Sequence, residues 1–179
     1  MLNRVLNFFI HPIASPAIDS LYRTCIAQAR QPFFYTDWQV PDSVDGRFDL
    51  LILHVLLVIQ RLQNHSEETQ QLFDILFADM DKNLREMGVS DISIAKKMKP
   101  MLAAFYGRAK SYEHALAGGG GEELVTALRR NIYGATEPSV DAVRRLTSYV
   151  RRTHVELAAQ NTDVILSGKV TFPAAGGHD

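Results

Sequence analysis

Apolar and polar residues follow a helical period along most of this chain. Between residues 91 and 117, apolar residues recur every three or four positions, and Lys96, Lys99 and Lys110 gather on the opposite side. The stretch from 66 to 87 has the same period, and no convincing set of alternating strand positions is found. The pattern predicts an all-α fold, a compact bundle of about six to seven helices with a short extended C-terminal tail.

Capping residues and helix breakers set the expected boundaries. Ser15 or Asp19 begins the first long helix, which ends before Pro32. Prolines and aromatic residues between 32 and 46 indicate an ordered connection without repetitive structure. Pro100 either kinks the fourth helix or starts a new segment. The remaining long helices are expected over about 43–64, 66–87, 90–117 and 136–160.

The length of 179 residues fits one domain with an arm. We expect residues 1–36 to form an N-terminal helical arm packed on the core and residues 37–179 to form the main helical domain. The longest apolar run, Leu50–Ile59, has about half the length that crosses a bilayer and contains His54, so we interpret it as a buried helix. No signal peptide is recognised, and the expected location is the cytoplasm.

Charge changes the picture, because the net charge of −1 hides two oppositely charged regions. Residues 1–91 hold 7 bases and 12 acids, a balance of −5. Residues 92–152 hold 11 bases and 5 acids, a balance of +6, and the remainder carries −2. Such asymmetry bears on the choice of partners rather than on the fold.

The side chains show no pattern typical of catalysis or metal binding. None of the six histidines has the paired ligands of a metal site, and the single cysteine, Cys25, has no catalytic motif around it. Asp79 and Asp81 lie about 200° apart around a helix, so they cannot face one substrate together. The sequence therefore predicts a protein that is not an enzyme, with no catalytic residue, no metal site and no cofactor.

Four arginines form the clearest basic feature. Arg144, Arg145, Arg151 and Arg152 repeat at i and i+7, opposite an apolar side that starts at Val140. A solvated helix face explains this spacing as well as a binding surface does. Guanidinium groups suit planar contact with carboxylate or phosphate, so acidic protein, ribosomal RNA and anionic lipid headgroups all remain open as partners.

Three blocks of the chain together resemble the ubiquinol–cytochrome c chaperone family. They are "QARQPFFYTDWQVPDSVDGRFDLLILH", the stretch from "FADMDKNLREMGVSD" to "YGRAKSYEHAL", and "ALRRNIYG" with "YVRR" and "LSGKVTF". The resemblance implies a helical assembly chaperone without catalytic activity, which binds newly made cytochrome b for assembly of the respiratory bc complex (complex III). The compact form without a transit peptide is similar to bacterial members.

The resemblance and the helix faces together suggest the residues that bind a partner. We expect a charged flank at the end of the third helix and on the fourth, formed by Asp79, Asp81, Arg85, Glu86, Lys97, Tyr106, Arg108 and Tyr112. Arg130 and Asn131 join them, but Arg129 stands where the family pattern has an aromatic residue. In the alternative interpretation, some of these charges connect the two helices, for example Glu86 with Lys97 or Arg108.

Other partners follow from the resemblance or from the residues. Mitochondrial family members pair with a small partner protein and lie near the ribosomal tunnel exit, so both contacts are open here. An RNA- or ribosome-binding adaptor, using Arg130 and the four arginines of the last long helix, is the alternative function. Peripheral contact with the cytoplasmic face of the inner membrane would use Leu2, Val5, Phe8 and Phe9. No DNA partner is expected.

Overall fold

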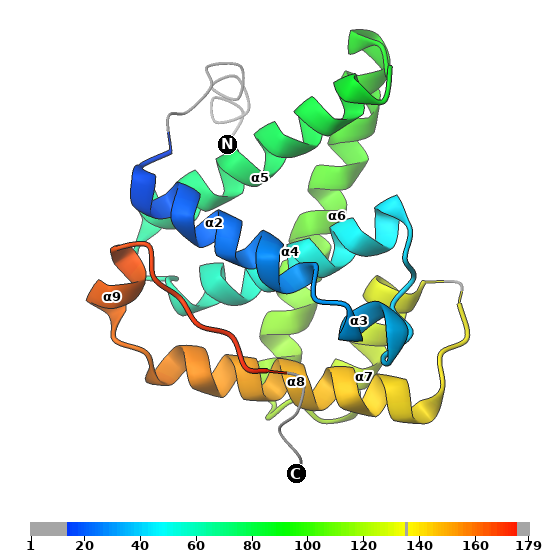
Figure 1. Ribbon diagram of the computed structural model, residues 1–179, viewed down its shortest axis with the longest axis vertical. Helices are drawn as coiled ribbons and strands as arrows, with labels where there is room; N and C mark the ends of the chain where they lie inside the picture. The colour runs from blue at the N-terminus through cyan, green and yellow to red at the C-terminus, as the bar shows by residue number, and fades with distance from the viewer. Residues whose placement is uncertain (1–13, 135, 175–179) are drawn as a thin grey trace.

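The computed structural model describes residues 14–134 and 136–174, and all regular structure within them is helical (Figure 1). The prediction of an all-α fold is therefore confirmed. The four residues expected to contact a membrane lie outside the described residues. In chain order the elements are α2 (Pro16–Ala29), α3 (Phe33–Thr36), α4 (Val44–Arg61), α5 (Ser66–Glu86), α6 (Asp91–Ala117), α7 (Glu122–Leu128), the π-helical turn η2 (Arg129–Tyr133), α8 (Val140–Ala159) and α9 (Thr162–Leu166).

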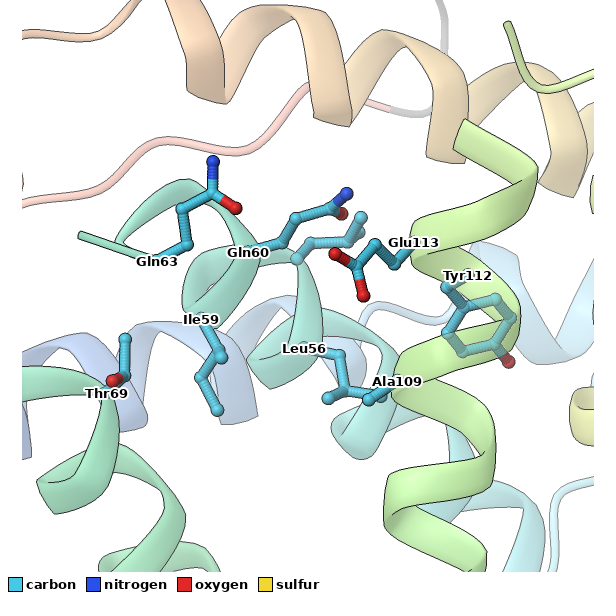
Figure 2. Close-up of a pocket in the computed structure, with 9 residues that line it drawn as sticks. Leu56, Ile59, Gln60, Gln63, Thr69, Ala109, Tyr112 and Glu113 are labelled. Carbon is cyan, nitrogen blue, oxygen red and sulfur yellow. The ribbon is translucent and has the colours of Figure 1, made fainter. Parts of the chain in front are cut away.

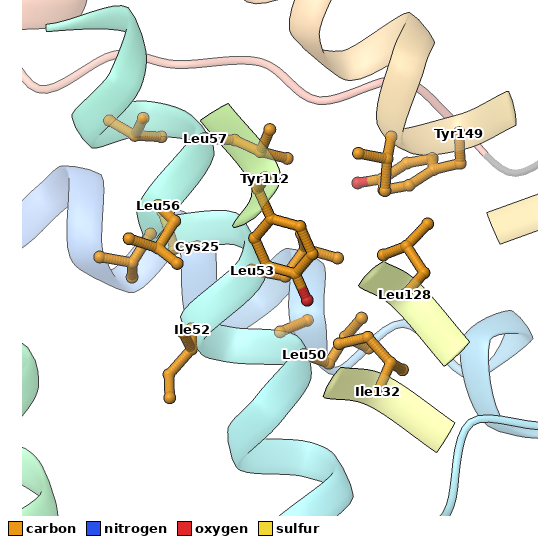
Figure 3. Close-up of a cluster of buried hydrophobic side chains, with 14 of the residues drawn as sticks. Cys25, Leu50, Ile52, Leu53, Leu56, Leu57, Tyr112, Leu128, Ile132 and Tyr149 are labelled. Atoms are coloured by element: carbon orange, nitrogen blue, oxygen red, sulfur yellow. The ribbon is translucent and has the colours of Figure 1, made fainter. Parts of the chain in front are cut away.

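Helix α4 forms the centre of the molecule because it is apolar nearly all round. Its residues from Ile52 to Val58 are all buried, and it contacts α2, α5, α6, η2 and α8. In Figure 3 its leucines face Tyr112 of α6, Ile132 of η2 and Tyr149 of α8. Within the described ranges, none of the helices combines the length and apolar character needed to span a membrane.

Several boundaries differ from those expected. Helix α6 continues through Pro100, which lies on its exposed side. Helix α8 begins at Val140 rather than near residue 136, because the side chain of Ser139 accepts a hydrogen bond from the Ala142 amide at 3.1 Å. The short helices α3 and α9 fall in segments expected to lack repetitive structure. At four and five residues, both are too short for a periodic pattern to reveal them.

The N-terminal helix α2 packs against α4 and α5 through a buried face that includes Cys25. Complete burial raises the pKa of the Cys25 thiol to about 12, so the thiol is a small core group rather than a nucleophile. After α9 the C-terminal segment runs back between α2 and α8 (Figure 1). Ser20 of α2 donates a hydrogen bond to the Gly168 carbonyl at the start of this segment, at 2.8 Å. The division of the chain at residue 36 stays a prediction.

His54 is buried in the core and fully hydrogen-bonded. Its Nδ1 lies 2.7 Å from the Leu50 carbonyl, which only accepts, so Nδ1 carries the proton. Nε2 therefore accepts from the Tyr149 hydroxyl at 2.8 Å, and that hydroxyl accepts from the Gln28 amide at 3.0 Å. Burial lowers the pKa of His54 to about 4, which keeps the ring neutral. The interpretation of His54 as a core residue is confirmed.

Removal of the Tyr149 hydroxyl should measure how much these buried hydrogen bonds contribute to the free energy of unfolding. We expect Tyr149→Phe to lower the free energy of unfolding by about 1–2 kcal/mol, because Nε2 of His54 is left without its donor. Urea denaturation at pH 7.5 would measure the change. Tyr106→Phe is the matched control, since Tyr106 is 60% exposed and should lose almost nothing. Equal losses of unfolding free energy in both variants would contradict the stabilising role assigned to the hydrogen bonds of Tyr149.

Candidate functional site

Helices α5 and α6 form a hairpin whose tip projects from the rest of the bundle (Figure 1). The turn at the tip needs a positive φ, and Gly88 supplies it with φ of 80°. Two large apolar side chains are exposed there, Met87 at 54% and Ile92 at 73%. The periodicity of α5 placed Met87 on the buried face, which is wrong because the turn carries it past the end of the core.

Arg85 connects the two helices at this tip. Its guanidinium donates from Nε to Asp81 at 2.6 Å and also pairs with Asp91 at the start of α6. These carboxylates raise the pKa of Arg85, so the charge is fixed at every physiological pH. Asp81 and Arg85 were expected on a partner-binding flank, and the structure also gives them a role within the hairpin.

The proposed connection from Glu86 to Lys97 or Arg108 is wrong. Glu86 pairs with Lys82 on its own helix, with 3.8 Å between Lys82 Nζ and Glu86 Oε1. Lys97 is exposed and forms no ion pair among the residues that the structure describes. Lys82, at the i−4 position of the same helix, is closer to Glu86 than any base of α6 and therefore forms the ion pair.

Asp79 and Tyr106 have different surroundings. Asp79 accepts a hydrogen bond from the buried Tyr22 hydroxyl at 2.8 Å, which joins α5 to α2. Tyr106 is exposed, and its ring stacks on Phe73 of α5 with 6.0 Å between the centroids. Tyr106 therefore presents one face of its ring to solvent while Phe73 supports the other.

Arg108 forms a largely buried ion pair that sequence reasoning missed. Its Nη2 lies 2.6 Å from Oδ1 of Asp49 on α4, and both side chains are about one-fifth exposed. Burial is the main influence on Asp49 and raises its pKa to about 6, although the charge of Arg108 acts in the opposite direction. Arg108 thus connects helix α6 electrostatically to the central helix α4, whereas Asp91 connects the start of α6 to α5.

Tyr112, Asn131 and Arg130 meet beside this ion pair. Tyr112 is buried, and burial raises the pKa of its hydroxyl, while the Arg108 charge and the Asn131 amide oppose that rise. Arg130 is exposed and donates to the Ser111 hydroxyl at 3.0 Å and to Oδ1 of Asn131 at 3.3 Å. The structure therefore brings these three residues together with Arg108, although they come from two distant parts of the chain.

The four arginines of α8 are divided among different contacts. Arg144 and Arg145 both donate to Asp141, at 2.7 and 2.6 Å, and these bonds lower the pKa of that carboxyl. Arg151 is exposed, and Arg152 reaches the Ala174 carbonyl at 3.2 Å. Arg144 and Arg145 are thus paired within α8, which favours the solvated face over an RNA-binding stripe.

The N-terminal end of the predicted apolar face of α8 also differs from the prediction. Val140 is 77% exposed because it is the first residue of the helix and projects beyond the neighbouring elements. The residues that follow it on the same face, Val143, Leu146, Val150 and Leu157, are buried as expected.

An apolar cleft of about 270 Å³ opens between α4, α5 and α6. Leu56, Leu57, Ile59 and Ala109 contribute apolar groups to its wall. Gln60 of α4 and Glu113 of α6 contribute polar groups to its lining (Figure 2). Sequence reasoning missed this cleft because its walls come from three helices.

The described residues hold no group of three or more histidine, cysteine, aspartate or glutamate side chains placed to bind a metal ion. Among the ionisable groups that meet, Asp49 and Arg108 form an ion pair, and Tyr22 donates a hydrogen bond to Asp79. The surface described above offers charged groups, hydrogen-bonding groups and exposed apolar side chains to a partner.

Comparison with known proteins agrees with the fold. Residues 36–172 match the model of the family described as Ubiquinol-cytochrome C chaperone. The chain belongs to this family. The match includes α4 to α9, and therefore both the α5–α6 hairpin and the junction of Arg108 with Asn131.

Two relatives and one solved structure extend the comparison. Ubiquinol-cytochrome c reductase complex assembly factor 1 of Mus musculus is 24% identical over 157 residues, which cover 85% of this chain and 53% of that protein. Its Xenopus laevis counterpart is 20% identical, with 85% and 78% covered. The chain spans about half the length of the mouse relative. The crystal structure of the Cbp3 homolog from Brucella abortus superposes with a TM-score of 0.83 at 29% identity, covering 99% of this chain and 97% of that one.

Proposed function

We propose that this protein is a non-enzymatic chaperone that binds newly made cytochrome b during assembly of ubiquinol–cytochrome c reductase. Family membership and the names of the mouse and Xenopus relatives as complex assembly factors support the role in assembly. Cytochrome b as the client is our extension of that role. A client that is only partly assembled exposes apolar surface, and a chaperone must cover it reversibly without chemistry.

The projecting tip of the α5–α6 hairpin is the observation that carries the proposal. Met87 and Ile92 are exposed apolar side chains, and the ion-paired Asp81, Arg85 and Asp91 belong to the same two helix ends. An apolar centre with a polar rim is the usual anatomy of a protein–protein contact. The hairpin turn is held by the Val89 amide bonded to the Leu84 carbonyl at 3.0 Å, so the surface is preorganised.

The double variant Met87→Ser/Ile92→Ser tests this role. We expect about tenfold less cytochrome b in affinity capture from the protein's own membranes, because each truncation removes apolar contact area. The melting temperature should stay within about 2 °C, since neither side chain is buried.

Val140→Ser/Val155→Ser is the matched control, because it removes two side chains of comparable exposure from α8. Its capture of cytochrome b should equal that of the unaltered protein. Equal losses in both variants, or none in either, would exclude the hairpin tip as the client contact.

Contacts with a small partner protein, with the ribosome and with the inner membrane remain predictions. The same capture experiment quantifies ribosomal proteins and other subunits together with cytochrome b. Charge reversal at Lys97 is the better probe of the charged flank. Reversal at Arg108 would confound it, because Arg108 also holds the buried Asp49.

A further inference from the structure

A cluster of buried polar groups without partners lies where α6 meets the π-helical turn η2. Nε of Arg108 has no hydrogen-bond partner among the described residues, and the Tyr112 hydroxyl and Nδ2 of Asn131 have no partner beyond their contact with each other. The two nitrogens can only donate, and the hydroxyl can donate as well. Even if Nδ2 of Asn131 donates to the Tyr112 hydroxyl, each of the three groups keeps one unused N–H or O–H. Buried donors are nearly always satisfied in folded proteins, so these unused donors at one junction indicate a missing acceptor.

A surface cavity of about 340 Å³, which is wide open to solvent, adjoins this cluster. Ala104 and Gly107 leave the surface of α6 open, and Arg108, Arg130 and Asn131 complete the wall. This lining carries two guanidinium groups and no carboxylate. Asp49, the partner of Arg108, is not among the lining residues. Space, positive charge and unused donors therefore coincide.

The backbone at the cavity is also unusual. Residues 129–133 form a π-helical turn. Such turns are rare in proteins overall, but those that occur are often found at functional sites. The turn supplies both Arg130 and Asn131. Arg130 is exposed and lines the cavity, and in the part of the chain that the structure describes its side chain donates to Ser111 and to Asn131.

We propose that this cavity binds a carboxylate, presented by an acidic side chain of a partner protein. The carboxylate displaces Arg130 from Ser111 and accepts from its guanidinium, and then from Nδ2 of Asn131 and Nε of Arg108. Only the source of the carboxylate rests on the proposed function. A monoanion fits better than a phosphate dianion, since one guanidinium charge is already balanced by Asp49 and one remains.

The test follows the Arg108 Nε–H and the Asn131 side-chain amide by NMR in the full chain. Four probes are compared: a blocked tripeptide with a central glutamate, its glutamine counterpart, acetate and inorganic phosphate. We expect both signals to shift with the glutamate peptide, more weakly with acetate, and not with the glutamine peptide. Shifts with acetate only, equal shifts with both peptides, or tighter binding of phosphate would overturn the proposal.

Two substitutions sharpen the result. Arg130→Gln should weaken binding of the glutamate peptide at least tenfold, whereas Arg145→Gln, an exposed arginine of α8, should leave it unchanged. Asn131→Asp places a carboxylate inside the cluster, so it should abolish peptide binding and raise the melting temperature. Peptide binding that survives both Arg130→Gln and Asn131→Asp would overturn the site.

The site and the proposed client fail in different ways. Absence of peptide binding in the NMR titration overturns the cavity, whatever happens in affinity capture. Normal peptide binding together with no capture of cytochrome b by the unaltered protein overturns the client and leaves the carboxylate site in place.

Discussion

Replacing Arg108 by leucine is expected to lower the free energy of unfolding by about 3 kcal/mol at pH 8. The variant leaves Asp49 charged and largely buried without its partner 2.6 Å away. Removal of one member of a buried pair costs more than the pair itself contributes, because the remaining charge is not solvated. Urea denaturation of the full chain measures the loss.

The same variant should lose much less at pH 5. Burial already raises the pKa of Asp49 to about 6 in the presence of Arg108, and removal of that positive charge raises it further. A carboxyl whose pKa is higher in the folded state than in the unfolded state stabilises the fold when protonated, and that contribution is lost as pH rises through the folded pKa. The effect of Arg108→Leu should therefore grow from pH 5 to pH 8.

The double variant Asp49→Leu/Arg108→Leu is the control for this interpretation. With both charges removed, most of the stability should return, and the dependence of the loss on pH should disappear. A loss that is equal at pH 5 and pH 8 would show that Arg108 contributes through the packing of its stem rather than through Asp49.

The Asp49–Arg108 pair also illustrates what could be predicted from the sequence. Local signals were sufficient for Ser15 and Ser43, whose side chains accept from Ile18 and Gly46 amides, and for the long helices between them and residue 117. They were insufficient for a pair 59 residues apart, because helical periodicity identifies an outward face but not the helix that approaches it.

The candidate site shows the same division. The family resemblance brought together Arg108, Tyr112, Arg130 and Asn131 from two blocks, and the structure places them at one junction. Sequence reasoning did not identify Asp49, Ser111, Ala104 or Gly107, which complete that junction. Gly107 offered a signal. A glycine inside a helix lowers helix stability, so its presence there usually has a packing or functional reason.

Glycine at position 46 has a different reason, and Gly46→Ala should be among the most damaging single substitutions. Gly46 lies in the first turn of α4, and a Cβ there would come within 2.1 Å of the Pro41 carbonyl oxygen. The preceding segment cannot easily move away. Trp38 is buried in it, and the Tyr133 hydroxyl donates to the Trp38 carbonyl at 2.9 Å.

We therefore expect Gly46→Ala to lower the free energy of unfolding by about 3 kcal/mol, measured by urea denaturation. Gly107→Ala is the matched control, because the new methyl group would have no atom within 4 Å, and the helix should gain about 0.5–1 kcal/mol. The same substitution thus has opposite signs at two helical positions. Unchanged stability of Gly46→Ala would mean that the segment from 37 to 42 can move away from α4.

Gly107 lines the cavity beside Arg108, so the Gly107→Ala variant should also bind the glutamate peptide more weakly. A purely structural role for that glycine predicts the gain in stability but not the loss of peptide binding.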